Sequence, residues 1–198
     1  MKSVLRRLSM LAVVALIVPV PSPSLAPTPD GGLKGSFDFK RVEITNSVLT
    51  WKWTDYNVSP AKSYTKTWRA GSGENKDECD KSYGSDSGGW LPAATYKLKG
   101  MFDNKNDLIK ARAIYFEDKV CSNGVTWRTG LFIHTEETAA QGQSCDQYCW
   151  NGVNDYKSKG CIKVSYADMP SVHSHYHTKG GDGRHEYYDL PAMLVVHS

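Results

Sequence analysis

The sequence lacks an apolar run long enough to cross a membrane as a helix. The longest such run, Met10–Val18, covers about half of the roughly 20 residues that a spanning helix needs. Repeats and low-complexity stretches are also missing, which excludes collagen-like, coiled-coil and multi-span membrane proteins. With 198 residues, of which 40% are hydrophobic and 23% charged, the chain has the size and composition of one globular domain.

A strong excess of charge of one sign is missing as well. The formal net charge is +3, and Lys2, Arg6 and Arg7 at the start of the chain account for it. The remaining residues carry 21 acidic and 21 basic side chains. Nucleic-acid binding calls for a concentrated basic face, so we expect no nucleic-acid partner.

Residues 1–26 have the three parts of a secretory signal peptide. Basic residues at the start precede the apolar run, and the helix-breaking segment Pro19–Pro23 follows it. An apolar run of this length is typical of a cleaved leader rather than of a permanent anchor. We therefore predict a signal peptide over 1–26, a linker over 27–35 and a single secreted domain over 36–198. We expect a monomer with no membrane anchor after processing.

The domain is predicted to be mainly β with one or two short helices. The 17 glycines, 11 tyrosines and 6 tryptophans favour strands joined by many turns. Ser165–Asp168 is typical of a capping box that opens a short helix. A strand beginning at Ser36–Phe39 is expected to extend through Val42–Thr45 to a turn at Thr45–Ser47, and Trp68–Gly73 to lead into a polar loop. Further strand patterns occupy Val48–Thr54, Trp90–Lys99, Ala111–Phe116, Arg128–His134 and Met193–Val196.

Five cysteines are an odd number for an exported protein. In an oxidising compartment Cys79, Cys121, Cys145, Cys149 and Cys161 cannot all pair within one chain. Four can form two bridges, in three possible pairings, and the fifth is either a link to another chain or a reactive thiol. Zinc binding by the closely spaced third and fourth cysteines is disfavoured, because no second pair at ligand spacing accompanies them.

The stretch Ser158–Val164 places Cys161 at a tight turn that enters a strand. Gly160 lets the chain approach closely, so that its N–H and that of Cys161 can point at a developing oxyanion. A thiol needs a base to become a good nucleophile, and histidine is the usual one. His134 ends the strand pattern Leu131–His134 on the face opposite its apolar residues. Without the flanking motif, a structural half-cystine and a packed histidine would be the favoured interpretations.

These motifs are similar to those of the L,D-transpeptidase (YkuD-like) catalytic domain. That family carries a histidine at a strand end, followed by a Ser-x-Gly-Cys-apolar-basic motif, and Ile133–Thr135 and Ser158–Lys163 match both. Upstream, Trp68–Gly73 resembles an earlier strand of the family and Trp90–Tyr96 its Pro-x-Gly-x-aromatic turn. The resemblance covers about residues 36–198 and implies an L,D-transpeptidase-like β-sandwich.

The resemblance also implies peptidoglycan chemistry in the cell envelope or cell wall, with no cofactor. The family's cysteine attacks a stem tetrapeptide at its diamino acid, expels D-alanine and forms a thioester, which the amine of a neighbouring stem resolves into a direct cross-link. By position, Cys161 is the nucleophile, His134 the base, and the N–H groups of Gly160 and Cys161 the oxyanion site. Ser158 and Lys163 fall at support and substrate contacts, and the Thr135 carbonyl is placed to orient the imidazole. Two alternatives are an L,D-carboxypeptidase, in which water resolves the thioester, and a non-catalytic module that binds the wall or a metal.

Three departures from the family pattern bear on specificity. Thr135 replaces a glycine, which alters the approach of the substrate backbone, and Lys163 replaces an arginine, which loses a bidentate fork. An insertion between His134 and Cys161 is expected to form a lid stapled by Cys145–Cys149, with Trp150 facing the substrate. The second bridge is then expected between Cys79 and Cys121.

The segment Val172–His177 is a weaker candidate for a metal site. If it is extended, His173, His175 and His177 share one face and can bind Zn²⁺ or Cu²⁺. No carboxylate or thiolate at matching spacing completes the set, so we interpret the segment as a solvated polar loop and predict no metal.

Overall fold

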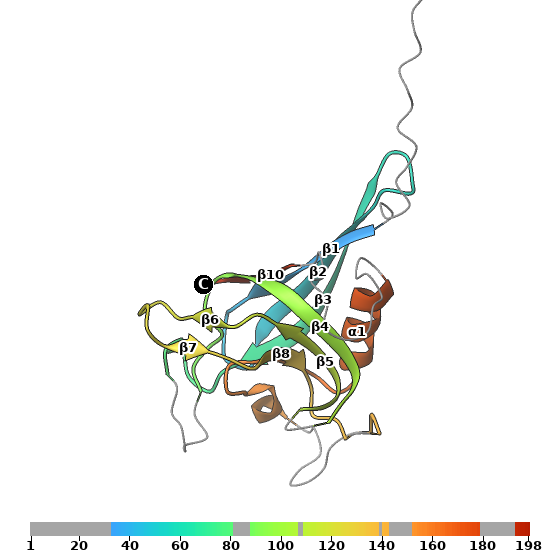
Figure 1. The fold of residues 1–198 in the computed structure, drawn as a ribbon. Coiled ribbons are helices and arrows are strands. Elements are labelled where there is room, and N and C mark those ends of the chain that lie inside the picture. The colour runs from blue at the N-terminus through green and yellow to red at the C-terminus, as the bar shows by residue number, and fades with distance from the viewer. Residues whose placement is uncertain (1–32, 81–87, 107–108, 139, 143–151, 179–192) are drawn as a thin grey trace, which may run out of the picture.

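The computed structural model describes residues 33–80, 88–106, 109–138, 140–142, 152–178 and 193–198 (Figure 1). Within these ranges β-strands dominate, joined by one α-helix and one short 3₁₀ helix. The elements are β1 Leu33–Lys40, β2 Ser47–Asp55, β3 Lys62–Ser72, β4 Thr95–Asn106, β5 Lys110–Phe116, β6 Lys119–Val120, β7 Trp127–Arg128, β8 Leu131–His134, η1 Val153–Tyr156, β9 Ile162–Val164, α1 Met169–Thr178 and β10 Met193–His197.

Eight of the strands close into one barrel, in the order β1-β10-β4-β5-β8-β9-β3-β2. Neighbours are antiparallel except at two places, where β1 pairs with β10 and β8 with β9 in parallel. The prediction of a mainly β domain is confirmed, whereas the predicted sandwich is wrong, because the strands form one closed sheet. Closure leaves no free strand edge along the barrel. Alternating apolar residues satisfy a sandwich and a barrel equally, so the pattern does not separate them.

Large aromatic side chains fill the barrel. Phe37 of β1 and Trp51 of β2 are fully buried, and their rings meet at 4.5 Å between centroids. Tyr176 of α1 packs edge-on against the Trp51 ring at 5.8 Å, so the helix closes off this part of the core. A Cβ at Gly35 would lie 2.0 Å from the Trp51 ring. The glycine therefore makes room for the indole.

Two segments differ from the sequence prediction around β3. Val42–Thr45, expected to continue a strand, forms a turn in which the Glu43 carbonyl accepts from the Asn46 amide at 3.2 Å. Trp68–Gly73 leads into the loop as expected, but it contains the end of a longer strand, β3, which begins at Lys62. The first six residues of β3 are exposed. Because no buried face imposes alternation on them, the sequence gives no strand signal there.

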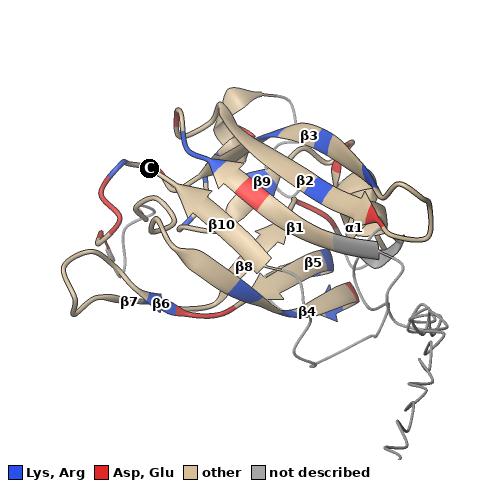
Figure 2. Ribbon diagram, turned by 90° about the horizontal axis from the view of Figure 1, so that it is seen from above, with Lys and Arg blue, Asp and Glu red and all other residues tan. Residues whose placement is uncertain are grey.

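Ser165 makes one of the two hydrogen bonds of the predicted capping box just before α1. The Ser165 hydroxyl accepts from the Asp168 amide at 3.1 Å and donates to the Asp168 carboxylate at 2.6 Å. In the part of the chain that the structure describes, no helix has the length and apolar character to cross a membrane. Lys and Arg are interspersed with Asp and Glu along the strands (Figure 2).

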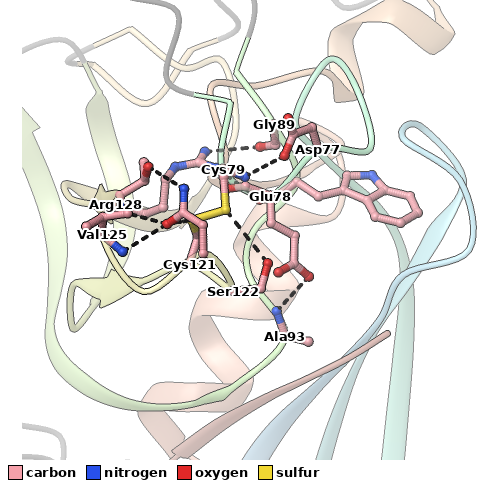
Figure 3. Close-up of a disulfide and its surroundings, with 12 residues drawn as sticks. Asp77, Glu78, Cys79, Gly89, Ala93, Cys121, Ser122, Val125 and Arg128 are labelled. Atoms are coloured by element: carbon pink, nitrogen blue, oxygen red, sulfur yellow. Dashed lines mark hydrogen bonds between the residues drawn. A yellow bond between two sulfur atoms is a disulfide. The ribbon is translucent and has the colours of Figure 1, made fainter.

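A disulfide joins Cys79 to Cys121, which confirms that predicted bridge (Figure 3). It links the loop after β3 to the β6–β7 hairpin. The predicted signal peptide, the Cys145–Cys149 bridge and Trp150 of the lid all lie outside the described residues. β1 begins at Leu33, inside the segment 27–35 expected to be a linker.

Removing this disulfide is expected to destabilise the fold strongly. The bridge spans 42 residues, and the loop-closure estimate for that length is about 4 kcal/mol. Urea unfolding of the double variant Cys79→Ala/Cys121→Ala is expected to show a loss of that order. Cys161→Ala serves as the control because it removes a sulfur and leaves the bridge intact. Equal stability of the double variant and the native protein would contradict the expectation.

Candidate functional site

The parallel pairing of β8 with β9 brings the two motifs together. Ile133 pairs with Ile162, and His134 with Lys163. Both isoleucines are fully buried in the core. Since side chains alternate along each strand, His134 and Lys163 lie on the outer face. Cys161 directly precedes β9, so the alternation places it on that outer face, diagonal to His134.

A backbone hydrogen bond orients the imidazole of His134. Its Nδ1 lies 3.0 Å from the carbonyl oxygen of Thr135. A carbonyl only accepts, so Nδ1 carries the proton and Nε2 keeps a free lone pair. The structure therefore contains the hydrogen bond expected from the Thr135 carbonyl. Thr135 as a whole residue is only 3% exposed, so the contact that the structure gives it with the site is the hydrogen bond to His134.

The surroundings of His134 keep it neutral. Burial lowers the pKa of its imidazole to about 4, and the nearby Lys163 ammonium adds to the effect, while the bond to Thr135 opposes it. Lys163 itself forms an ion pair with Glu136 and is largely buried. At neutral pH the ring is thus in the form that can accept a proton. The predicted substrate contact of Lys163 stays a prediction.

The depressed pKa of His134 makes stability depend on pH. Between pH 6.5 and about 4 the unfolded chain binds a proton at this ring that the folded protein does not bind. Folding stability is therefore expected to fall as the pH drops through this window, and His134→Gln to remove that part of the decline. Urea unfolding at half-unit steps of pH measures it. The exposed-histidine variant His197→Gln is the control, and a decline unchanged in His134→Gln would contradict the assignment.

Cys161 is a free, half-buried cysteine. Its Sγ donates to the Gly130 carbonyl oxygen at 3.6 Å. Burial raises the pKa of the thiol to about 11, although the Phe132 backbone and the charges of Arg128 and Lys163 oppose the rise. At neutral pH the thiol and the imidazole are therefore both uncharged.

Ser158 fixes the turn that carries the cysteine. Its hydroxyl donates to the Cys161 carbonyl at 2.6 Å and accepts from the Gly160 amide at 3.2 Å. It also accepts from the Gly73 amide at 3.1 Å, which ties the turn to the chain beyond β3. The Gly160 N–H is thus already engaged. The predicted oxyanion site of the Gly160 and Cys161 N–H groups stays a prediction.

Gly160 meets two requirements that exclude any other residue. Its φ is +110°, a conformation that favours glycine. A Cβ built there would lie 2.0 Å from Nη2 of Arg128. The motif's glycine is therefore needed for backbone shape and for the close approach of a guanidinium.

Sequence reasoning missed Arg128, which lies against the cysteine turn. It is 4% exposed, and its guanidinium donates to four backbone carbonyls, one of which is marked in Figure 3. The acceptors are Glu78, Trp90 at 3.1 Å, Gly89 at 3.0 Å and Lys159 at 2.9 Å. An arginine at the start of a strand pattern looks in sequence like any surface arginine. All four acceptors are backbone atoms, so no residue type in the sequence indicates that they bind a guanidinium.

The histidines of the segment 172–177 lie in α1, so both the extended arrangement and the polar loop are wrong. His173 Nε2 is 3.1 Å from the Phe102 carbonyl, whereas the His175 ring packs edge-on against Trp53 and Trp68. Helical spacing thus turns the two rings in different directions. The described residues hold no cluster of three metal-ligating side chains. The His177 side chain is outside them.

No family model, curated protein or solved structure matches this chain. The motifs and the geometry around Cys161 are therefore the features that point to a function.

Proposed function

We propose that the protein is an exported L,D-transpeptidase that acts on peptidoglycan stem peptides through a thioester at Cys161. One observation carries the proposal. A free cysteine directly before β9 and a neutral histidine in β8 lie on the same face of adjacent parallel strands, with the Nε2 lone pair of the ring unoccupied by the orienting bond. The motif resemblance supplies the substrate class.

The proposed reaction uses His134 as a proton carrier. As Sγ of Cys161 attacks the diamino-acid carbonyl, Nε2 takes the thiol proton. The tetrahedral intermediate then expels D-alanine, whose amine receives that proton, and the thioester forms. An amine from a second stem peptide attacks the thioester and gives its proton to Nε2. The cysteine leaves as a thiol when this proton returns to sulfur.

Mass spectrometry of the intact protein tests the proposal. After incubation with a stem tetrapeptide, we expect an adduct equal to the tripeptide acyl group, mapped to Cys161, and cross-linked dimers among the products. A carbapenem, an acylating inhibitor of the family that the motifs resemble, is expected to add to the same residue. Tripeptide without any dimer would replace the transferase by an L,D-carboxypeptidase. No adduct with either reagent would overturn the enzyme proposal.

A further inference from the structure

Arg128 is a buried cation that is held by main-chain atoms. All four terminal N–H bonds of its guanidinium are used on the carbonyls of Glu78, Gly89, Trp90 and Lys159. Within the described ranges no carboxylate lies at ion-pair distance from it. Carbonyl dipoles satisfy the hydrogen bonds of a guanidinium but do not neutralise its charge.

The charged groups around Arg128 and Cys161 come from several elements. Asp77 and Asp80 in the loop after β3 and Tyr96 of β4 interact electrostatically with the guanidinium, as does Cys161. Burial raises the pKa of Tyr96, so its hydroxyl stays neutral. The adjacent strands β8 and β9 carry the neutral ring of His134 and the Lys163 ammonium, whose charge is paired with Glu136.

The guanidinium lies directly behind the cysteine turn. Nη2 donates to the carbonyl of Lys159, two residues before Cys161, and lies 2.0 Å from the position that a Gly160 Cβ would take. Its charge therefore acts across the backbone of the turn, and it favours the ionised form of the sulfur. Since the terminal donors are all in use, the action on Cys161 is through charge and turn geometry.

We propose that Arg128 is a positioning residue for Cys161, whose fixed charge, held behind the Lys159–Gly160 turn, compensates the negative charge that the sulfur gains when it loses its proton. The inference rests on the proposed role of Cys161 as nucleophile. Lys163 does not replace this charge, because Glu136 neutralises it locally. Burial disfavours the thiolate, and Arg128 offsets part of that effect.

The pH dependence of thiol alkylation tests this inference. Full-length protein is treated with iodoacetamide between pH 6 and 9, and the rate at Cys161 is followed by peptide mapping. In this range the alkylation rate is proportional to the thiolate fraction, because the pH is well below the pKa of the Cys161 thiol. An opposite charge nearby shifts a pKa by 1–3 units, so the neutral variant Arg128→Gln is expected to react at least about tenfold more slowly at every pH. Arg128→Lys keeps the charge and is expected to stay within about twofold of the native rate.

Two comparisons separate charge from folding. Arg41 is a second buried arginine, bonded to Glu78 in the same loop, so Arg41→Gln disturbs that loop while leaving the alkylation rate unchanged. Thermal unfolding confirms that each variant is folded. If Arg128→Gln does not fold, the alkylation rate of Arg128→Lys is compared with that of the native protein. A tenfold lower rate in Arg128→Lys overturns the assignment of the effect to charge.

The inference and the proposed function can fail independently. Equal alkylation rates for native protein and folded Arg128→Gln overturn the role of Arg128, even if the enzyme cross-links stem peptides. A tenfold slower Gln variant in a protein that never acylates supports the effect of Arg128 on the thiol and rejects the reaction.

Discussion

Gly160→Ala is expected to lower the melting temperature by about 10 °C and to abolish acylation of Cys161. The new Cβ would meet Nη2 of Arg128 at 2.0 Å, and the residue would have to keep a φ of +110°. Left-handed strain contributes about 1–2 kcal/mol and overpacking about 1–3 kcal/mol. A domain of this size loses about 2–4 °C per kcal/mol. Calorimetry and adduct formation measure the two effects.

Gly124→Ala is the matched control for this substitution. Gly124 has a φ of +74°, and a Cβ built there meets nothing within 4 Å. It therefore carries the backbone strain without the collision. If both variants lose the same stability, the contact with Arg128 contributes nothing, and the account of the cysteine turn given above is wrong.

Cys161→Ala is expected to lower product formation from stem peptides by at least about 10⁴-fold, because loss of a nucleophile removes the covalent route. The fold is expected to persist, since the sulfur takes part in no disulfide and alanine fits within the same space. Product analysis by chromatography and a melting curve measure the two quantities together.

His134→Gln is the companion variant. It leaves the thiol in place and removes the proton acceptor, so acylation is expected to slow strongly without disappearing. Unchanged product formation in Cys161→Ala would exclude the thioester mechanism, whatever the histidine variant does. If Cys161→Ala loses all product formation because it does not fold, Cys161→Ser is tested instead, since serine keeps the shape of the side chain.

Local patterns predicted the parts of the site that depend on local geometry. Cys161 follows a glycine at a turn, and His134 ends an alternating strand, so both positions can be inferred from the sequence. Ser165 likewise predicts the start of α1, because helix capping depends on residues that are close together in the sequence. The Cys79–Cys121 bridge was inferred by assigning the other cysteines different roles, and the structure contains it.

The parts that were missed depend on pairings between distant segments. The barrel closes where Phe37 pairs with Leu194, and no local pattern encodes that parallel contact. Arg128 binds carbonyls from three separate segments, which only the finished fold brings together. The hydrogen bond from the Gly160 N–H to the Ser158 hydroxyl is a detail of the folded turn that the sequence pattern does not specify. Trp150 and the lid remain predictions.

The high pKa of the Cys161 thiol has a consequence for how a free cysteine persists beside a disulfide. Sulfur exchange and oxidation proceed through the thiolate, and with a pKa of about 11 almost none is present at neutral pH. The native protein is thereby shielded from disulfide shuffling between this sulfur and the Cys79–Cys121 bridge. An unfolded chain lacks this protection, because the pKa of its Cys161 thiol returns to the ordinary value for cysteine. Correct pairing of Cys79 with Cys121 is therefore expected to be favoured once Cys161 is folded into its site.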